Sequence, residues 1–110
     1  GSHWSLLVYR RHFGEDDSSR FEHYDSGGGS NAPFAKAVAL KMIPLMRPQQ
    51  KGLTLKLVSM TTPMQANGFD CGMYALAIAD EIIAAHARNE LGPPTDAIRG
   101  ITPAAIALKR

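Results

Sequence analysis

The sequence predicts a single small α+β domain in which a short antiparallel sheet packs on one central helix. Its length of 110 residues fits one hydrophobic core and no more. Two strand-like segments, residues 4–9 and 20–25, are joined by a polar stretch, which is typical of an antiparallel hairpin. A further apolar run, residues 71–79, is long enough for a buried helix. We therefore expect the hairpin and this helix to share one core.

The first strand is predicted over Trp4–Tyr9, where nearly every residue is apolar and strand formers dominate. Such a continuous run indicates a strand that is buried on both faces. A polar hairpin loop is expected over residues 10–19, and a second strand over Arg20–Asp25. Because the start of the first strand faces the end of the second, His3 and Asp25 are predicted to lie at the same end of the sheet.

A helix is predicted after the glycine-rich loop 26–30. Asn31 is a candidate N-cap residue, and Pro33 lies just inside the helix start. Four apolar side chains recur at helical spacing and predict the face that packs into the core. They are Phe34, Val38, Met42 and Leu45. Pro44 is expected to kink or end this helix, and Pro48 to lie outside it.

The second half of the chain is predicted to hold one strand and two helices. Apolar and polar residues alternate over Leu53–Met60, which indicates a half-exposed strand. The helix over 71–79 is apolar all round, so we expect it to be the buried core helix. Its continuation over 80–90 is amphipathic, and Gly92-Pro93-Pro94 is expected to end it. Thr102-Pro103 is predicted to open a last short helix.

The segment over 65–72 holds the only cysteine of the chain. A turn signal and then Asp70, a good N-cap residue, precede Cys71 and place it in the first turn of the central helix. There the unpaired N–H groups and the helix dipole favour a thiolate. Gln65 could project its amide N–H in front of the sulfur, and Gly72 would allow close approach of a substrate backbone. The segment therefore suggests a nucleophile beside an oxyanion hole.

Each candidate residue also has a structural interpretation. A lone cysteine is most often a small buried hydrophobic residue, and Asp25 could simply form a turn. Trp4 could belong to the core, and Gln65 could satisfy the loop backbone. A start at Gly-Ser-His is also what a cleaved expression tag leaves, although the Trp-Ser-Leu-Leu that follows favours a native His3. His23 shares a strand face with Asp25, and we favour a structural role for it.

Composition argues against several classes of protein. The net charge of +2, with no basic cluster larger than a pair, does not indicate binding of nucleic acid. No apolar stretch approaches the ~20 residues that span a bilayer, and no signal peptide is evident. We therefore expect no membrane association and an intracellular location, in the cytoplasm, the nucleus or both. One cysteine excludes an internal disulfide, and the histidines are not at metal-ligand spacing, so no metal or cofactor is expected.

Four segments together resemble the Ulp/sentrin-specific family of cysteine proteases. They are His3-Trp4-Ser5-Leu6-Leu7-Val8-Tyr9, His23-Tyr24-Asp25-Ser26, Gln65, and Asp70-Cys71-Gly72-Met73-Tyr74. That family has a papain-like fold and a catalytic triad in the chain order His, Asp, Cys. Its members cleave ubiquitin-like modifiers after a glycine pair. The resemblance implies His3 as general base, Asp25 as its orienting partner and Cys71 as nucleophile. It also implies Gln65 as an oxyanion donor and Trp4 as an aromatic wall over the glycine tail of the substrate.

Within the family, Leu-Leu-Val-Tyr after His-Trp, and His-Tyr-Asp-Ser, look most like the deneddylase branch. The resemblance thus implies a thiol protease or isopeptidase that removes a Nedd-type modifier from its precursor or from protein conjugates. A SUMO-specific protease, or a truncated module that binds a modifier without catalysis, is the alternative. The family's catalytic domain is about twice as long, so residues 1–110 would be a partial domain that is incomplete at its N-terminus. We expect slow or undetectable cleavage by these residues alone.

Overall fold

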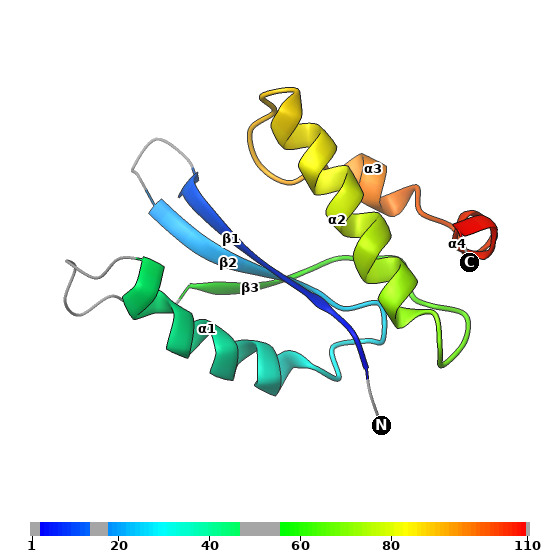
Figure 1. Ribbon diagram of the computed structural model, residues 1–110, viewed down its shortest axis with the longest axis horizontal. Helices are drawn as coiled ribbons and strands as arrows, with labels where there is room; N and C mark the ends of the chain where they lie inside the picture. Colours follow the sequence, from blue (N-terminus) through cyan, green and yellow to red (C-terminus); the bar gives the residue numbers. More distant parts are fainter. Residues whose placement is uncertain (1–2, 14–17, 47–55, 110) are drawn as a thin grey trace.

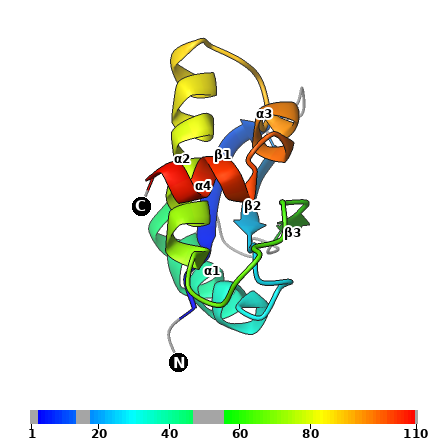
Figure 2. The same cartoon turned by 90° about the vertical axis from the view of Figure 1, so that its right-hand side faces the viewer.

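The computed structural model describes residues 3–13, 18–46 and 56–109. In chain order the elements are β1 (Leu6–Phe13), β2 (Ser18–Tyr24), α1 (Ala32–Met46), β3 (Leu57–Met60), α2 (Cys71–Ala87), α3 (Thr95–Arg99) and α4 (Pro103–Lys109). The helix α1 covers one face of the sheet, α2 covers the other, and α3 and α4 lie beside α2 (Figure 1; Figure 2). This arrangement agrees with the predicted α+β class. None of the helices described is long and apolar enough to cross a membrane.

The strand β2 is central, because β1 pairs with it antiparallel on one side and β3 pairs with it parallel on the other. The register sets Leu6 opposite Tyr24 in the first pair and Met60 opposite Tyr24 in the second. The predicted antiparallel pairing is confirmed for β1 and β2, but the sheet is mixed, because β3 adds a parallel neighbour that was not predicted. Parallel neighbours need a crossover connection, and α1 lies in that connection between β2 and β3.

The strand β1 starts two residues later than predicted, and the hairpin strands extend into the predicted loop. Residues 10–13 and 18–19, which were expected in that loop, form strand. As an edge strand, β1 leaves residues 6–10 only half-buried, so the expectation of a strand buried on both faces is wrong. Trp4 precedes the strand and is 66% exposed.

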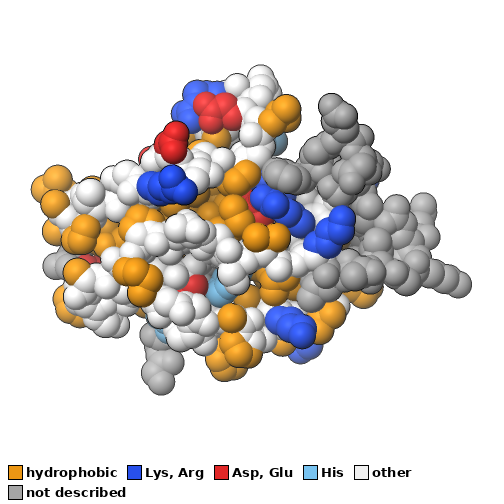
Figure 3. Space-filling model, turned by 180° about the vertical axis from the view of Figure 1, so that it is seen from behind, with side chains coloured by type: hydrophobic (Ala, Val, Ile, Leu, Met, Phe, Trp, Pro, Cys, Tyr) orange, Lys and Arg blue, Asp and Glu red, His pale blue; other side chains and the backbone are white. Residues whose placement is uncertain are grey.

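The helix α1 packs on the sheet through alanines and not through the predicted apolar stripe. Ala35 and Ala39 are its buried residues, whereas Phe34 and Leu45 are 70% and 72% exposed and Val38 is half exposed. Small side chains let a helix backbone approach a sheet closely, so the larger neighbours one position away point outward. Hydrophobic side chains are accordingly visible on the surface over α1, at the lower edge of Figure 3. The prediction that this stripe forms core is therefore wrong.

Two predicted boundaries on this side of the chain are shifted. The helix α1 runs through Pro44 and ends at Met46, so this proline does not end it. Pro48 lies outside the described residues. Of the strand predicted over Leu53–Met60, the structure shows Leu57–Met60, and residues 53–55 also lie outside the described part.

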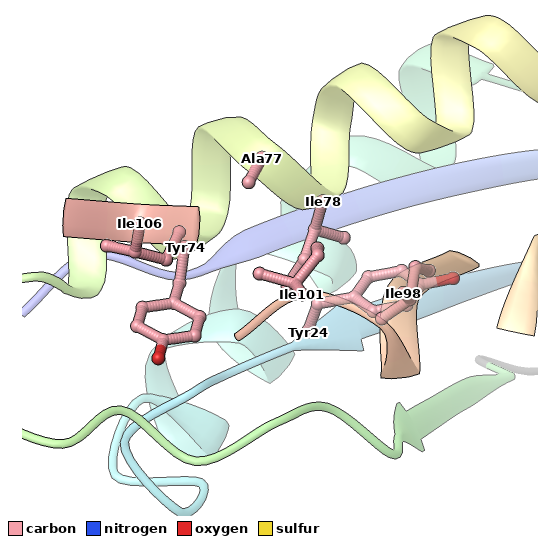
Figure 4. Packing of buried hydrophobic residues seen from close by; sticks show 7 residues of the cluster. All are labelled: Tyr24, Tyr74, Ala77, Ile78, Ile98, Ile101 and Ile106. Atoms are coloured by element: carbon pink, nitrogen blue, oxygen red, sulfur yellow. The ribbon is translucent and has the colours of Figure 1, made fainter. Parts of the chain in front are cut away.

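The main hydrophobic cluster lies between the sheet and the helices α2, α3 and α4 (Figure 4). Its buried members are Tyr24, Tyr74, Ala77, Ile78, Ile98, Ile101 and Ile106. The hydroxyl of Tyr24 donates to the fully buried Glu22, which also accepts hydrogen bonds from Arg10 and Arg20. Two guanidinium groups and a hydroxyl thus offset the cost of burying this carboxylate.

The helix α2 begins at Cys71, as predicted, but its first half is not buried all round. Leu76 is 63% exposed on the side that faces away from the cluster. The last helix α4 begins at Pro103, also as predicted, and the hydroxyl of Thr102 accepts a hydrogen bond from the N–H of Ala105. No helix was predicted over 95–99, where α3 forms.

The C-terminus of α2 is closed by an asparagine. Asn89 has a left-handed backbone with φ of 58°. Its N–H donates to the carbonyl of His86, and the N–H of Glu90 donates to the carbonyl of Ala85. This left-handed cap satisfies the last carbonyls of the helix before the chain reaches Gly92-Pro93-Pro94, the segment predicted to end it.

Candidate active site

His3 and Asp25 meet at one end of the sheet, as the hairpin predicts. His3 precedes β1 and Asp25 follows β2, and Nε2 of His3 lies 2.6 Å from Oδ1 of Asp25. The backbone N–H of Gly27 also donates to Oδ1, and that of Asn31 donates to Oδ2. Burial raises the pKa of Asp25, but the hydrogen bonds from His3, Asn31 and Gly27 outweigh burial and lower it overall. The ionised carboxylate therefore holds the imidazole.

Cys71, the first residue of α2, lies against the residue that follows His3. The N–H of Trp4 donates to Sγ of Cys71 at 3.3 Å, across 67 positions of the chain. The thiol is buried, with 3% of the residue exposed. This contact joins the start of α2 to the sheet end that carries His3 and Asp25, so the three predicted triad residues share one site.

Asp70 occupies the N-cap position of α2 without acting as the predicted cap. Its side chain makes no capping bond to the helix, and Oδ2 accepts a hydrogen bond from Nδ2 of Asn67 at 2.8 Å. Oδ1 of Asn67 accepts from the N–H groups of Phe69 and Asp70. The side chain of Asn67 therefore braces the turn that presents Cys71.

Gln65 is held at both ends of its side-chain amide. Oε1 accepts a hydrogen bond from the hydroxyl of Ser26 at 2.7 Å, and Nε2 donates to the carbonyl of Asn67 at 2.6 Å. Its backbone N–H also donates to the carbonyl of Ser26. The amide carries two N–H groups, and the bond to Asn67 uses one of them. Gln65 thus does bond the loop backbone, while its function as an oxyanion donor stays a prediction.

Trp4 and Gly72 form an apolar surface beside the thiol. The large exposed fraction of Trp4 rules out the core interpretation of this residue. A Cβ atom on Gly72 would lie 3.7 Å from Cδ1 of the indole, so Gly72 lies next to the ring. Met64 and Phe69, in the loop before α2, are also largely exposed. Sequence reasoning did not single out these two, because an isolated exposed apolar residue carries no periodic signal.

Asn31 stands at the start of α1 as predicted, but its side chain is directed to the site. Nδ2 donates to the carbonyl of His3 at 2.8 Å and to the hydroxyl of Ser5 at 3.1 Å. The same hydroxyl lies 2.8 Å from Nε2 of His23, in keeping with the structural role predicted for this histidine. Burial lowers the pKa of His23, and His3 lowers it further, against an opposing effect of Asp25. His23 is therefore neutral at pH 7.

A pocket of about 180 Å³ lies beside this hydrogen-bonded group, between the hairpin and α1. Its lining residues are Ser5, Leu7, His23, Asn31, Phe34, Ala35 and Val38. The three polar side chains bond one another, so the pocket offers a ligand mainly apolar contact. Within the described parts of the chain, no group of three or more His, Cys, Asp or Glu side chains is placed to hold a metal ion.

The converging residues follow in the chain order histidine, aspartate, cysteine, and the domain is that of a papain-like cysteine protease. The chain belongs to the Ulp1 protease family, whose C-terminal catalytic domain is matched over residues 1–91.

Several curated proteins are similar to this chain. Sentrin-specific protease 8 from Mus musculus and its Homo sapiens counterpart are each 36% identical over all 110 residues, which cover 45% and 47% of those proteins. NEDD8-specific protease 1 from Arabidopsis thaliana is 37% identical over 79 residues, which are 72% of this chain and 31% of that protein. The chain thus spans slightly less than half the length of the first two relatives.

Proposed function

We propose that this chain carries the catalytic residues of a thiol protease that cleaves a ubiquitin-like modifier after its C-terminal glycine pair. The observation that carries the proposal is that His3 lies 2.6 Å from Asp25 while the N–H of Trp4, the next residue, donates to Sγ of Cys71 at 3.3 Å. Membership of the Ulp1 protease family supports the reaction class. The relative named NEDD8-specific protease 1 makes a Nedd-type modifier the first candidate, and those named sentrin-specific keep a SUMO-type modifier as the alternative.

In the proposed reaction His3 acts as the base. With Nε2 engaged by Asp25, Nδ1 is the ring nitrogen that takes the proton of the Cys71 thiol. The thiolate attacks the carbonyl carbon of the terminal glycine, and the carbonyl oxygen becomes an oxyanion. The N–H groups at the start of α2 and Nε2 of Gln65 are the proposed donors to that oxygen. The leaving amine takes a proton from His3 as the C–N bond breaks, and water then hydrolyses the thioester with His3 again as base.

The same geometry supports a binding role for Trp4 and Gly72. The indole lies next to Gly72, the N–H of Trp4 donates to the thiol, and most of Trp4 is exposed to solvent. A substrate tail made of glycines has no Cβ atoms and can lie flat in a narrow space beside the ring. The indole would then bury apolar surface against a glycine tail but not against a tail with larger side chains. We propose that this contact selects glycine next to the cleaved bond.

Modifier–fluorophore fusions test the proposal directly. We expect the wild-type chain to release fluorophore from a Nedd-type fusion faster than from SUMO or ubiquitin fusions. Cys71→Ala should abolish release while the far-ultraviolet circular dichroism of the folded chain is retained. A Nedd-type modifier that ends in a glycine electrophile should form a covalent adduct with the wild-type chain and none with Cys71→Ala. A folded wild-type chain that neither releases fluorophore nor forms the adduct would contradict catalysis and favour the non-catalytic alternative.

A further inference from the structure

We propose that Asn31 is a positioning residue that keeps His3 aligned with Asp25 during turnover, an inference that rests on the proposed function. Asn31 bonds both partners at once. Its backbone N–H donates to Oδ2 of Asp25 at 2.9 Å, and its Nδ2 donates to the main-chain carbonyl of His3 at 2.8 Å. The orienting carboxylate and the backbone of the base are therefore fixed to the same residue.

The segment that carries His3 needs such a fixed point. The strand β1 begins at Leu6, and the first pair of the ladder is Leu6 with Tyr24, so residues 3–5 precede the sheet hydrogen bonds. The ring of His3 is bonded to Asp25, but the imidazole changes its protonation state during the proposed reaction. The bond from Asn31 to the His3 carbonyl involves neither the ring nor the thiol, so it persists while the proton moves.

Asn31 is itself held on a long and rigid element. Its carbonyl accepts the N–H of Ala35, the first buried residue of the 15-residue helix α1. Its side chain also donates to the hydroxyl of Ser5, which in turn lies at hydrogen-bond distance from the buried His23. The two N–H groups of one amide thus serve the two acceptors, the His3 carbonyl and the Ser5 hydroxyl. Because α1 packs on the sheet, its position also fixes the position of the His3 backbone through Asn31.

The chemistry at this position is specific for asparagine. An aspartate has nearly the same shape but would set a carboxylate oxygen against the carbonyl of His3, where a donor is required. An alanine removes both side-chain bonds and keeps the backbone N–H that donates to Asp25. Ser30, the neighbouring loop residue, is exposed and provides a matched control. We therefore distinguish the side-chain bonds of Asn31 from general effects on its loop with three variants: Asn31→Ala, Asn31→Asp and Ser30→Ala.

The first readout is steady-state cleavage of the modifier–fluorophore fusion. Misplacing a catalytic group by about 1 Å can cost on the order of 10²-fold in rate, so we expect kcat of Asn31→Ala and Asn31→Asp to fall by roughly 10- to 100-fold. KM should stay close to the wild-type value, because the proposed tail-binding residues Trp4 and Gly72 are untouched. Ser30→Ala should match the wild type in both constants. A purely structural role would lower only the amount of folded enzyme, so kcat corrected for the folded concentration would return to the wild-type value.

The second readout needs no substrate. Proton NMR of the full chain should show a low-field resonance from the ring N–H of His3 that bonds Asp25, and His3→Gln assigns it. We expect this resonance in the wild type and in Ser30→Ala, and its loss or broadening in the Asn31 variants. Asn31→Asp serves where Asn31→Ala does not fold.

The two readouts decide the inference together. Wild-type kcat in a folded Asn31 variant, or reduced kcat with an unchanged His3 resonance, would overturn it. If the wild type releases no fluorophore, the resonance alone decides the inference, and the proposed function fails only if the covalent adduct is absent as well. An unchanged resonance in the Asn31 variants then overturns the positioning role, and its loss supports that role.

Discussion

Replacing Ile78 with alanine is expected to destabilise the chain strongly, whereas the same truncation at Leu76 is expected to cost little. The two residues are two positions apart on α2, so helix propensity and distance from Cys71 are nearly matched. Ile78 is 1% exposed and points into the cluster that contains Tyr24 and Ile98 (Figure 4). Leu76 is 63% exposed. The pair therefore tests which face of the helix is buried.

The expected magnitudes follow from burial. Each substitution removes three carbon atoms, worth about 2.4 kcal/mol in all at ~0.8 kcal/mol per buried group. The full transfer term applies to Ile78, and the cavity left in the cluster adds to it, so we expect a loss of about 3–4 kcal/mol. Only about one third of Leu76 is removed from water, which limits its loss to about 1 kcal/mol. A difference of about 2 kcal/mol corresponds to roughly 8–16 °C in Tm for a domain of this size.

Urea unfolding followed by circular dichroism measures both free energies of unfolding, and an unchanged m value shows that the unfolded state is comparable. Equal losses, or a larger loss for Leu76→Ala than for Ile78→Ala, would refute the register of α2. That result would also refute the buried position of Cys71, because the same register of α2 places this residue at the buried start of the helix.

Three further predictions concern the site. Ser26→Ala removes the hydroxyl that bonds Oε1 of Gln65, and we expect a lower kcat with a loss of only about 0.5–1.5 kcal/mol in urea unfolding; unchanged kcat would contradict the link. The pKa of Asp25 is lowered in the folded chain, so the ionised carboxylate stabilises the fold fully above the ordinary carboxyl value of 3.8. This stabilisation is lost as pH falls through the lower pKa of the folded state. The Tm values of wild type and Asp25→Asn should therefore converge at the lowest pH. The pKa of His23 is also lowered in the folded chain, so the unfolded chain takes up the proton first and the free energy of unfolding of the wild type should fall as pH drops below 6.5. The same dependence of stability on pH in His23→Gln would disprove this.

The meeting of His3 with Asp25 was predictable, because hairpin geometry alone brings the start of one strand to the end of the next. The start of α2 at Cys71 was likewise local information. The parallel pairing of β3 was not predictable, since its partner is chosen by a crossover and not by neighbouring residues. Periodicity also could not distinguish two adjacent stripes on α1, and close packing on the sheet favoured the alanines over Phe34.

Capping residues illustrate a second limit of local patterns. Asn31 and Asp70 stand at helix starts, where their preference places them, yet the site or the preceding loop takes their side chains. Short polar side chains reach several donors and acceptors, and the tertiary structure decides which of them is used. A capping signal therefore gives the position of a helix start and leaves the hydrogen-bond partner open.

The two contacts that assemble the site differ greatly in the length of chain that they close. The bond between His3 and Asp25 spans 22 residues, and the contact between Trp4 and Cys71 spans 67. Closing a longer loop costs more entropy, and long-range contacts form later in folding than a hairpin does. We therefore expect the contact between His3 and Asp25 to form first and Cys71 to reach the site last, when α2 docks. Under the proposed function, a half-folded chain would have its histidine and aspartate in contact but its cysteine away from them, and it would stay inactive until folding is complete.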